Sequence, residues 1–428
     1  MELALRAGLT RLGGGLLAGL LAADAGHRGP ATDCGAGHQA RFVSYRGKAV
    51  ATVLGTVSIR RAWYHCHQCG HGLAPRDAEL GVPGQAMSPG LRKMAARAAA
   101  AVPFAKAAAL VGELAGITLT GKRAGRSAEA DGAAAAAVIE AQAAAITART
   151  LVPLPPPAPA PGKLYIAIDG TGVPVVAAET EGRPGNGEDG KARTREVKLC
   201  AVFTQATCDD DGKPARDPLS SSYLATFAPA SEFGVLMAAE ARRRGAGHIR
   251  QLTILGDGAV WIWNLADQHV PAATQIVDPY HAREHVHDLA TLATRLLRDS
   301  QPHWLTQRLD ELDHGDIPAL LAAGDALNFT GSLARERDKQ LGYFDTNAHR
   351  MRYAHFRSLG LFVGSGVVEA GCKAVIGQRL KLSGMRWTVP GAASIATLRC
   401  QEASNRWEEI WHRPHNQTPA ADLTRQAS

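Results

Sequence analysis

The sequence predicts an α/β protein, in which a mixed β-sheet with flanking helices follows a small cysteine-rich unit and a helical region. Three observations predict this fold. Cysteine and histidine pairs cluster among strand-type segments near the N-terminus, an alanine-rich stretch follows them, and apolar strand-type runs alternate with helical patterns further on. Six prolines in residues 151–163 exclude a helix or a central strand there, so this segment is predicted to be an extended linker.

Length and composition narrow the classes of protein that fit. The 428 residues are 46% hydrophobic and 20% charged, which excludes a disordered chain. Seven scattered cysteines exclude a disulfide-stapled secreted scaffold. No apolar run approaches the ~18 residues of a membrane-spanning helix. The formal net charge of +7 favours a polyanionic partner.

The N-terminal residues 1–30 have two interpretations. Arg6 and Arg11 precede a short glycine–leucine run, which could imitate a signal peptide. We favour an amphipathic helix over residues 2–21, because clustered thiols of the metal-binding type follow at once and suit a reducing cytoplasm. The sequence therefore predicts a cytoplasmic protein that does not enter a membrane.

Residues 31–78 contain the cysteine cluster. Strand-type segments lie around it, at 41–45, 50–53 and 57–63. Cys66 and Cys69 have the C-x-x-C spacing of a zinc knuckle, and Cys34 with His38 would complete a Cys₃His zinc site. Other histidines could supply the fourth ligand instead: His65, His67 and His71. We therefore predict a zinc-ribbon-like unit, with a ribbon that has lost its metal as the alternative.

Residues 79–150 are alanine-rich and helical in pattern. A helix at 105–114, a glycine-containing turn and a second helix at 118–131 form the helix-turn-helix arrangement of many DNA-binding proteins. The second helix carries early basic residues that we predict to contact DNA: Lys122, Arg123 and Arg126. A plain structural hairpin has the same pattern, so this alternative stays open.

The part after the linker, residues 164–428, alternates strands and helices. Strands are predicted at 164–168, 196–204, 222–227, 251–255 and 274–277. Helices are predicted at 231–244, around Trp261 and Trp263, and at 280–298. The order β-β-β-α-β-α-β-α is that of a ribonuclease H-like domain, a mixed sheet with helices on both faces. Residues 289–360 are predicted to form a helical insertion before a last helix at 367–382.

Three carboxylates occupy positions that this fold would bring together. Asp169 ends the first strand, Asp257 follows the fourth strand, and Glu369 begins the last helix. The first and fourth strands are neighbours in the predicted layout, so their ends are expected to converge. Carboxylate oxygens suit Mg²⁺, and two such ions ~4 Å apart can activate an attacking oxygen and stabilise the departing one in a phosphodiester displacement.

The ordered segments IDGTGVPV, LGDGAVWIWN, VDPYHAREH and GSGVVEAGCKAVIGQRLKLSGMRW resemble a DDE transposase of a bacterial insertion sequence, of the ISKra-type group. The likeness reaches back to RRAWYHCHQCGHGLAPRD and PFAKAAALVGELAGITLTGKRAGRSAEADG, and so covers about residues 34–411. The family has an earlier C-x-x-C, of which this sequence retains only Cys34.

The resemblance implies a function and a set of partners. Asp169, Asp257 and Glu369 would bind Mg²⁺ or Mn²⁺. The protein would cut the element ends and then join the freed 3′-hydroxyl to target DNA. At least two protomers would assemble on the DNA, in the cytoplasm at the nucleoid.

Further residues are predicted to lie beside the carboxylates. Asp278 and His281 match a pattern of the wider transposase class, a Cys or Asp followed after two residues by His, and are expected near the site without binding metal. Lys373, one helical turn after Glu369, would contact a phosphate. By the resemblance, the basic residues that follow would grip transposon DNA: Arg379, Lys381 and Arg386.

Two other functions fit parts of the sequence. His281 to His285 spells H-x-x-E-H, the inverted zinc-peptidase pattern, with Glu369 as a conceivable third ligand. That interpretation leaves Asp169, Asp257 and the cysteine cluster without a role. The second alternative is a DNA-binding regulator derived from a transposase that has lost catalysis, although all three carboxylates are present.

Overall fold

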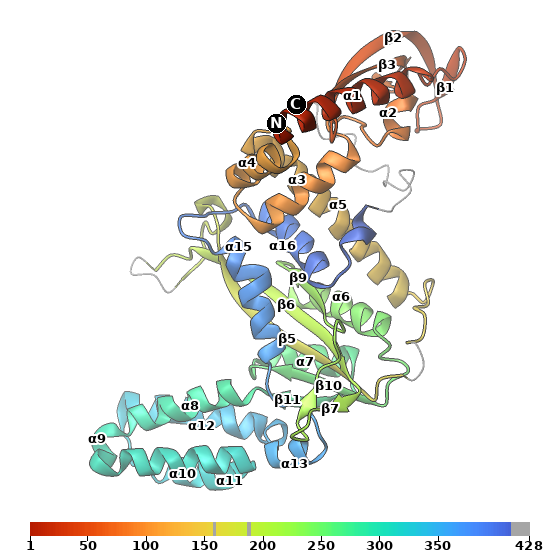
Figure 1. Ribbon diagram of the computed structural model, residues 1–428. Coiled ribbons are helices and arrows are strands. Elements are labelled where there is room, and N and C mark those ends of the chain that lie inside the picture. Colours follow the sequence, from red (N-terminus) through yellow and green to blue (C-terminus); the bar gives the residue numbers. More distant parts are fainter. Residues whose placement is uncertain (157–159, 186–189, 412–428) are drawn as a thin grey trace. The chain divides into compact units, whose positions relative to one another are not determined.

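The computed structural model describes residues 1–156, 160–185 and 190–411 (Figure 1). The chain divides into two compact units, one of residues 1–132 with those after 405, and one of residues 133–405. The middle of the predicted linker and the end of the predicted domain 164–428 lie outside the described residues.

The long helix α5 (Gly121–Thr147) explains where the division falls. Its C-terminal half packs Ala143 and Ile146 against Ala239 of α6 (Ala230–Arg243), so that half belongs to the second unit. The boundary therefore lies inside a helix and not in the segment 151–163. The helix continues through its glycines because the alanines around them have the highest helix propensity.

The first unit contains a four-stranded antiparallel sheet in the order β1-β2-β3-β4. Its strands are β1 (Ala31–Asp33), β2 (Gln39–Thr52), β3 (Gly55–Cys66) and β4 (His71–Leu73). The segments 41–45 and 50–53, which we predicted as separate strands, are one continuous strand. An irregularity between Phe42 and Ser44 leaves Val43 unpaired, and a bulge of this kind bends a strand without ending it.

Two helices flank this sheet. The predicted N-terminal helix is present as α1 (Glu2–Ala22), and its Leu17 and Leu21 pack against Val57 and Ile59 of β3. Helix α2 (Pro75–Glu79) follows β4. The burial of these aliphatic side chains is the main stabilising contribution at this end of the sheet.

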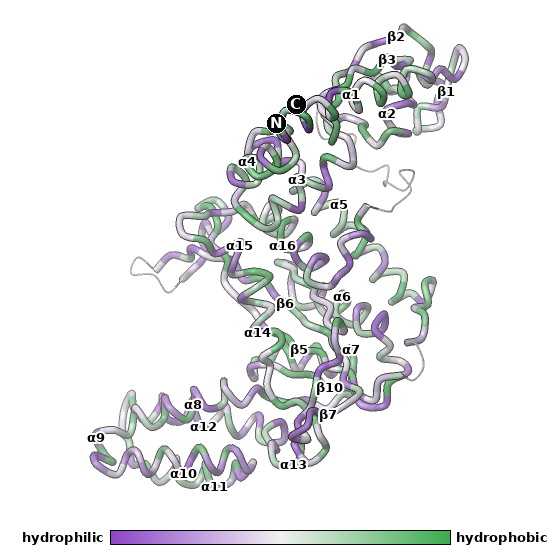
Figure 2. Tube along the Cα trace, viewed as in Figure 1, coloured by the Kyte–Doolittle hydropathy of each residue, from purple (hydrophilic) through white to green (hydrophobic). Residues whose placement is uncertain are grey.

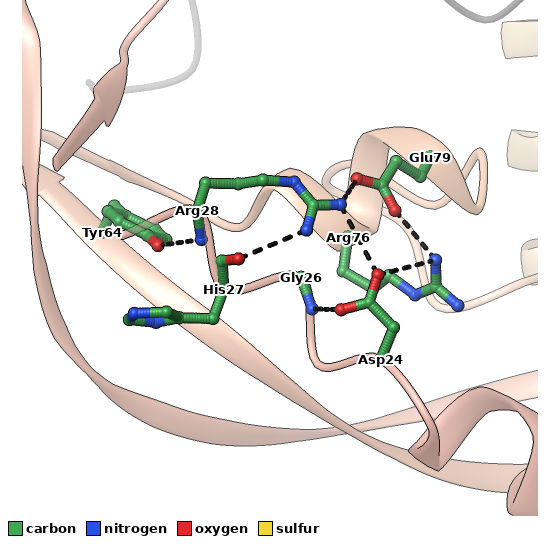
Figure 3. A network of polar contacts seen from close by, with 7 residues as sticks. All are labelled: Asp24, Gly26, His27, Arg28, Tyr64, Arg76 and Glu79. Carbon is green, nitrogen blue, oxygen red and sulfur yellow. Dashed lines mark hydrogen bonds and ion pairs between the residues drawn. The ribbon is translucent and has the colours of Figure 1, made fainter. Parts of the chain in front are cut away.

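A polar network fastens the connection between α1 and β1 to the sheet and to α2 (Figure 3). The guanidinium of Arg28 pairs with Asp24 at 3.6 Å and with Glu79. Arg76 pairs with the same two carboxylates, at 3.8 Å and 2.8 Å respectively. The Tyr64 hydroxyl accepts a hydrogen bond from the Arg28 backbone N–H at 2.6 Å. The two carboxylates of this network are therefore shared between two arginines.

Helices α3 (Pro89–Ala101), α4 (Phe104–Ala115) and α5 follow in the chain. The helix predicted at 105–114 is α4, and it ends at Gly116, whose φ of 70° is the left-handed conformation that glycine adopts readily. The helix predicted at 118–131 is the first part of the longer α5. An ion pair of 2.8 Å between Arg92 and Asp131 joins α3 to α5. Burial raises the pKa of Asp131 to about 6, against the opposing effect of Arg92.

The second unit is built on a five-stranded mixed sheet in the order β11-β10-β5-β6-β9. Its strands are β5 (Lys163–Pro174), β6 (Thr194–Gln205), β9 (Ser222–Thr226), β10 (Gln251–Gly256) and β11 (Thr274–Val277). Strand β10 runs parallel to β5 and β11, whereas β5, β6 and β9 are antiparallel. The predicted mixed α/β sheet is confirmed. A short ribbon, β7 (Thr207–Cys208) with β8 (Pro214–Ala215), follows β6.

Helices pack on both faces of this sheet. Successive strand residues point to opposite faces. Leu199 of β6 lies against Gly371 of α14 (Gly366–Gly371), on one face. The next residue, Cys200, points to the other face, toward α6: burial and then the charge of Glu240 in α6 raise the pKa of its thiol. Helix α7 (Val260–His269) packs beside α6, and α16 (Val389–Ala403) packs beside β9. Hydrophobic residues concentrate on the central strands (Figure 2).

The predicted insertion is helical. Its members are α8 (Pro279–Leu292), α9 (Thr294–Leu297), α10 (Gln301–His314), α11 (Ile317–Asp325), α12 (Gly331–Asn347) and α13 (Tyr353–Ser358). Helices α8, α10, α11 and α12 lie side by side (Figure 1) around a core that includes Leu289, Leu327 and Leu341. The single helix predicted at 280–298 is instead two, because α8 ends at Ala293. In the described part of the chain, no helix has the length and apolar character needed to cross a bilayer.

The last helix predicted at 367–382 is present but irregular. It begins as α14, continues as a π-helical turn (Cys372–Gly377) and ends as α15 (Gln378–Leu380). Helix α16, which the sequence pattern did not predict, then packs beside β9. Short 3₁₀ turns lie at Ala177–Glu179, Arg298–Ser300, Ala348–Arg350 and Trp407–Ile410.

Candidate functional site

Two of the predicted carboxylates lie on neighbouring strands. Asp169 does not end its strand as we predicted, because β5 continues through it to Pro174 in pairing with β6. Asp169 is in β5, and Asp257 directly follows β10. The parallel register pairs Ala167 with Leu255, so Asp169 and Asp257 are at matching positions two residues further along each chain. Each half-buried carboxylate accepts a backbone hydrogen bond through one oxygen, at 2.7 Å for Asp169 and 2.8 Å for Asp257. The strand register therefore places both at one edge of the sheet.

Glu369 comes to the sheet on α14. Gly371 makes the close approach of this helix possible, because a Cβ there would lie 2.7 Å from the Tyr223 ring and 3.1 Å from Leu199. The hydroxyl of Ser365, one turn before Glu369, donates a hydrogen bond of 3.1 Å to its carboxylate. The helix is thus held against β6 and β9 with Glu369 half-buried in its first turn.

The thiol of Cys372 connects this helix to Asp169. Burial and then the charge of Asp169 raise the pKa of Cys372, which keeps the thiol protonated and able to donate to that carboxylate. The sequence predicted only that Cys372 is a small buried residue, and it is 9% exposed. Its location near the carboxylates could have been predicted from the sequence, because Cys372 follows Glu369 by three residues and so lies on the same side of the helix. A π-helical turn begins at Cys372, and such turns are frequent at functional sites.

Asp278, which we predicted beside the site, is fully buried and connects three elements. It follows β11, and one carboxylate oxygen accepts from the N–H groups of Tyr280 (2.7 Å) and His281 (3.2 Å), which caps α8. The other oxygen accepts the N–H of Ser365. Because Ser365 also bonds Glu369, Asp278 orients the start of α14 and is a structural link. His281 is half-buried, with its Nδ1 3.4 Å from an Oε atom of Glu284.

Asp169, Asp257 and Glu369 do not form a ready metal site. Among the described residues, the one set of three or more possible ligands close enough to hold an ion is the cysteine–histidine cluster, and Asp169, Asp257 and Glu369 are not part of it. Carboxylates repel one another, and only a cation lowers the cost of bringing them together. Carboxylate oxygens are ligands that suit Mg²⁺, but these three residues are not among the possible ligands that the described residues gather.

The basic residues predicted near the carboxylates have different environments. The ammonium of Lys381 donates to the hydroxyl of Thr171 in β5, beyond Asp169, so it lies at the same edge of the sheet. Lys373 and Arg386 are exposed. Arg379 is fully buried, with its guanidinium 4.9 Å from the centre of the Trp387 ring. The prediction that Arg379 contacts DNA is therefore wrong for this structure, because the side chain packs in the core.

The basic residues predicted on the second helix of the helix-turn-helix are near one cavity. The cavity, of about 450 Å³, lies between the start of α5 and the segment 84–87, and Lys122, Arg123 and Arg126 line it. Arg123 donates to the Ala86 carbonyl at 2.6 Å, so one of its N–H groups stabilises the contact between α5 and the segment 84–87. Lys122 and Arg126 are exposed.

The cysteine–histidine cluster has the geometry of a metal site. Cys34 and His38 flank the connection between β1 and β2, while Cys66 and Cys69 bracket the turn between β3 and β4. The four ligand atoms lie within 4.8 Å of one another, with 3.6 Å between the Cys34 and Cys69 sulfurs and 3.1 Å between His38 Nδ1 and Cys69 Sγ. Burial and the neighbouring thiols raise the pKa of Cys69 to about 12. A bound cation would stabilise the thiolate and so offset the free energy needed to deprotonate it.

This donor set fits zinc. Three thiolates and one imidazole are a common tetrahedral zinc environment, so the cluster could hold a structural Zn²⁺. Of the histidines that sequence spacing left open, His38 is the one gathered with the thiols. His65 and His67 instead pack against each other, with ring centres 4.9 Å apart.

The H-x-x-E-H segment does not form such a cluster. The ring of His285 stacks on Tyr343 with centres 3.7 Å apart, and its Nδ1 lies 2.5 Å from the Gln340 side-chain oxygen. His281, Glu369 and His285 are not among the possible metal ligands that the described residues bring together. The contacts of His285 are those of a packed structural residue.

Tyr343 of α12 reaches the loop that carries Asp257, a contact that sequence reasoning missed. Its hydroxyl donates to the Asp257 carbonyl at 2.9 Å, and a Cβ at Gly258 would lie 2.5 Å from its ring. Burial and then the charge of Asp257 raise the pKa of Tyr343, so the phenol stays a donor. The helical insertion thereby holds the Asp257 loop in place.

We expect Tyr343→Phe to lower the free energy of unfolding by about 1 kcal/mol, the contribution of one neutral hydrogen bond. Chemical denaturation of the purified variant measures this change. Tyr280→Phe is the matched control, because Tyr280 is 65% exposed and its change should have little effect. Equal unfolding free energies for Tyr343→Phe and the wild type would contradict the role of the hydroxyl.

Comparison with protein-family models gives no match for this chain. Comparison with curated proteins gives no match either.

Proposed function

We propose that this protein is a DDE-type DNA transposase that cuts the ends of an insertion sequence and joins them to target DNA. The observation that carries the proposal is the β5–β10 register, which sets Asp169 and Asp257 side by side at one sheet edge. Glu369 lies on α14, which packs against β5 and β6. The strand order β11-β10-β5-β6-β9 is the order expected of a ribonuclease H-like sheet and supports the proposal.

The chemistry follows from these residues. Asp169, Asp257 and Glu369 would hold Mg²⁺ or Mn²⁺, which supplies activation of the attacking oxygen and stabilisation of the leaving oxygen. A water molecule attacks the phosphorus at the element end, the bond from phosphorus to the 3′-oxygen breaks, and that oxygen leaves as a 3′-hydroxyl. The freed hydroxyl then attacks a target phosphodiester in the same way. Lys381, which donates to Thr171 at this edge, would bind a phosphate oxygen.

The remaining parts supply DNA binding in this proposal. The zinc-ribbon-like unit and the helices α4 and α5 would hold the element end, with Lys122 and Arg126 as exposed contacts. Two ends must be held together, so at least two protomers would act on the DNA, within the cytoplasm at the nucleoid.

Incubation of the purified protein with Mg²⁺ and DNA that carries the element ends tests the proposal. We expect strand cleavage and joining by the wild type, and a loss of about 10²–10³-fold or more in Asp257→Asn and Asp169→Asn, because each removes a negative ligand from the reacting centre. Asp288→Asn is the matched control, since Asp288 is exposed on α8 and its change should leave cleavage intact. Binding of the ends without cleavage by the wild type would overturn the proposal.

A second candidate is a DNA-binding regulator without catalysis. The observation that favours it is that the three carboxylates are not gathered into a metal site among the described residues. The same assay separates the two functions. A regulator would bind the element ends equally well as wild type and as Asp257→Asn, and neither protein would cleave them.

A further inference from the structure

We infer that the β2–β3 hairpin carries a duplex-DNA-binding surface whose phosphate contacts are made by Arg41, Arg46 and Arg60. This surface is separate from the basic residues of α5 and from those near the carboxylates. The inference deepens the proposed function, because it names the part of the first unit that would hold DNA. It is tested by binding alone, so it can fail while cleavage succeeds.

Aromatic rings hold two of these arginines in place. The Arg46 guanidinium lies 4.6 Å from the centre of the Trp63 ring, and that of Arg60 lies 4.2 Å from the centre of the Tyr45 ring. Stacking covers one face of a guanidinium and leaves its edge N–H groups free to bind phosphate oxygens. Both arginines are exposed, and Tyr45 is 41% exposed. The side chains are thus ordered before any partner binds, which lowers the entropy cost of binding.

Three of the four acidic residues around the hairpin are already paired with other cations. Residues 24–79 contain seven Arg or Lys and four Asp or Glu. Asp77 pairs with Lys48 (3.0 Å) and Arg61 (2.9 Å). Asp24 and Glu79 are shared by two arginines in the network of Figure 3. The fourth, Asp33, accepts a backbone hydrogen bond from Gly35.

The three arginines of the surface therefore keep their charge unneutralised. None of Arg41, Arg46 and Arg60 forms an ion pair with a described residue, and all three are exposed on one hairpin. Unneutralised cations on an ordered surface release condensed counterions when they bind DNA phosphates, and this release drives association. The charge pattern thus fits a polyphosphate partner.

The shape of the hairpin favours duplex DNA. Strand β1 pairs with β2 only as far as Arg41, and β4 pairs with β3 only from Tyr64 onward. Between these pairings and the tip, the ribbon has two strands, and α1 packs on the face that carries Val57 and Ile59. Register places Gly47 opposite Arg60 and Arg46 opposite Arg61, so Arg46 and Arg60 project from opposite faces. The face opposite α1 carries Tyr45 and Arg60 and is exposed, and proteins that read DNA with β-ribbons lay such strands in a groove of the duplex.

The test is duplex binding at several salt concentrations, without Mg²⁺, by the full chain and its Arg46→Gln/Arg60→Gln variant. We expect the variant to bind about tenfold more weakly, and the slope of log affinity against log salt to fall by about two, one unit for each phosphate that the variant no longer neutralises. The weakening should be similar for duplexes of unrelated sequence, because phosphate contacts carry no sequence information. Arg46→Lys/Arg60→Lys keeps the charges and should regain most of the slope.

Arg295→Gln/Arg335→Gln is the matched control, because it removes two exposed charges from the helical insertion. Unchanged zinc content in each variant shows that the ribbon remains folded. Wild-type affinity in Arg46→Gln/Arg60→Gln, or an equal weakening in the control, would overturn the inference. If the hairpin variant loses duplex binding but the wild type never cleaves with Mg²⁺, the inference stands and the transposase proposal fails.

Discussion

Cys66→Ser is expected to abolish zinc binding and to unfold the four-stranded sheet of the first unit. Strands β1 and β4 have three residues each, and the ligands tie them to the central hairpin. The hydrophobic cluster beside the ligands is small and includes the ligands Cys34 and Cys66 themselves. A structural zinc contributes about 10–16 kcal/mol of apparent binding free energy to such small units, far more than this cluster could replace.

Metal analysis and amide hydrogen exchange measure the outcome. The wild type should contain one zinc per chain. The variant should contain nearly none, and its amide protection should fall in residues 31–73 but not in β5 or β10. Cys208→Ser is the control, because Cys208 is exposed and outside the cluster. A wild type that is protected here without zinc would show that the ribbon has lost its metal.

Asp278→Ala is expected to lower the free energy of unfolding by about 3–5 kcal/mol, through removal of a helix cap and of buried hydrogen bonds. The carboxylate is fully buried and accepts from three backbone N–H groups, of Tyr280, His281 and Ser365. Alanine would leave all three without this acceptor. Because Ser365 orients Glu369, cleavage should also fall if the transposase proposal holds.

Denaturation curves of Asp278→Ala and Asp278→Asn separate these contributions. Asparagine keeps one oxygen that can cap α8 but presents an NH₂ group to the Ser365 N–H, so its effect on stability should be smaller. Asp288→Ala on the exposed face of the same helix should change stability little. A decrease below about 1 kcal/mol in Asp278→Ala would show that water replaces the missing acceptor.

The strands of the second unit and the cysteine cluster could be predicted from the sequence because their signals are local. An apolar run such as residues 164–168 gives a buried strand wherever it lies, and C-x-x-C fixes two thiols on one turn. The adjacency of Asp169 and Asp257 also followed from strand order, because their strands are parallel neighbours, although β5 continues past Asp169 to Pro174. The identity of the fourth zinc ligand could be decided only from the structure, because both His38 and His71 lie at a spacing from the cysteines that suits a zinc ligand.

Other features depend on contacts between distant segments. Arg379 has the same local pattern as Lys381, yet one is buried against Trp387 and the other reaches the sheet edge. Sequence spacing does not decide which side of an irregular, partly π-helical segment faces the core. The start of α5 was predicted and its length was not, because Gly132 has the pattern of a helix end while the alanines beyond it extend the helix.

The contact between Tyr343 and Gly258 has a consequence for how related sequences can vary. The φ of +99° at Gly258 and the tyrosine ring beside it leave no room for a side chain, so neither position can change freely alone. Among homologues we expect glycine to persist at position 258 even where residue 343 is small, because this φ strains any other side chain, and an aromatic residue at 343 adds a steric clash. The helical insertion would then constrain Gly258, which lies 85 positions before Tyr343 in the chain.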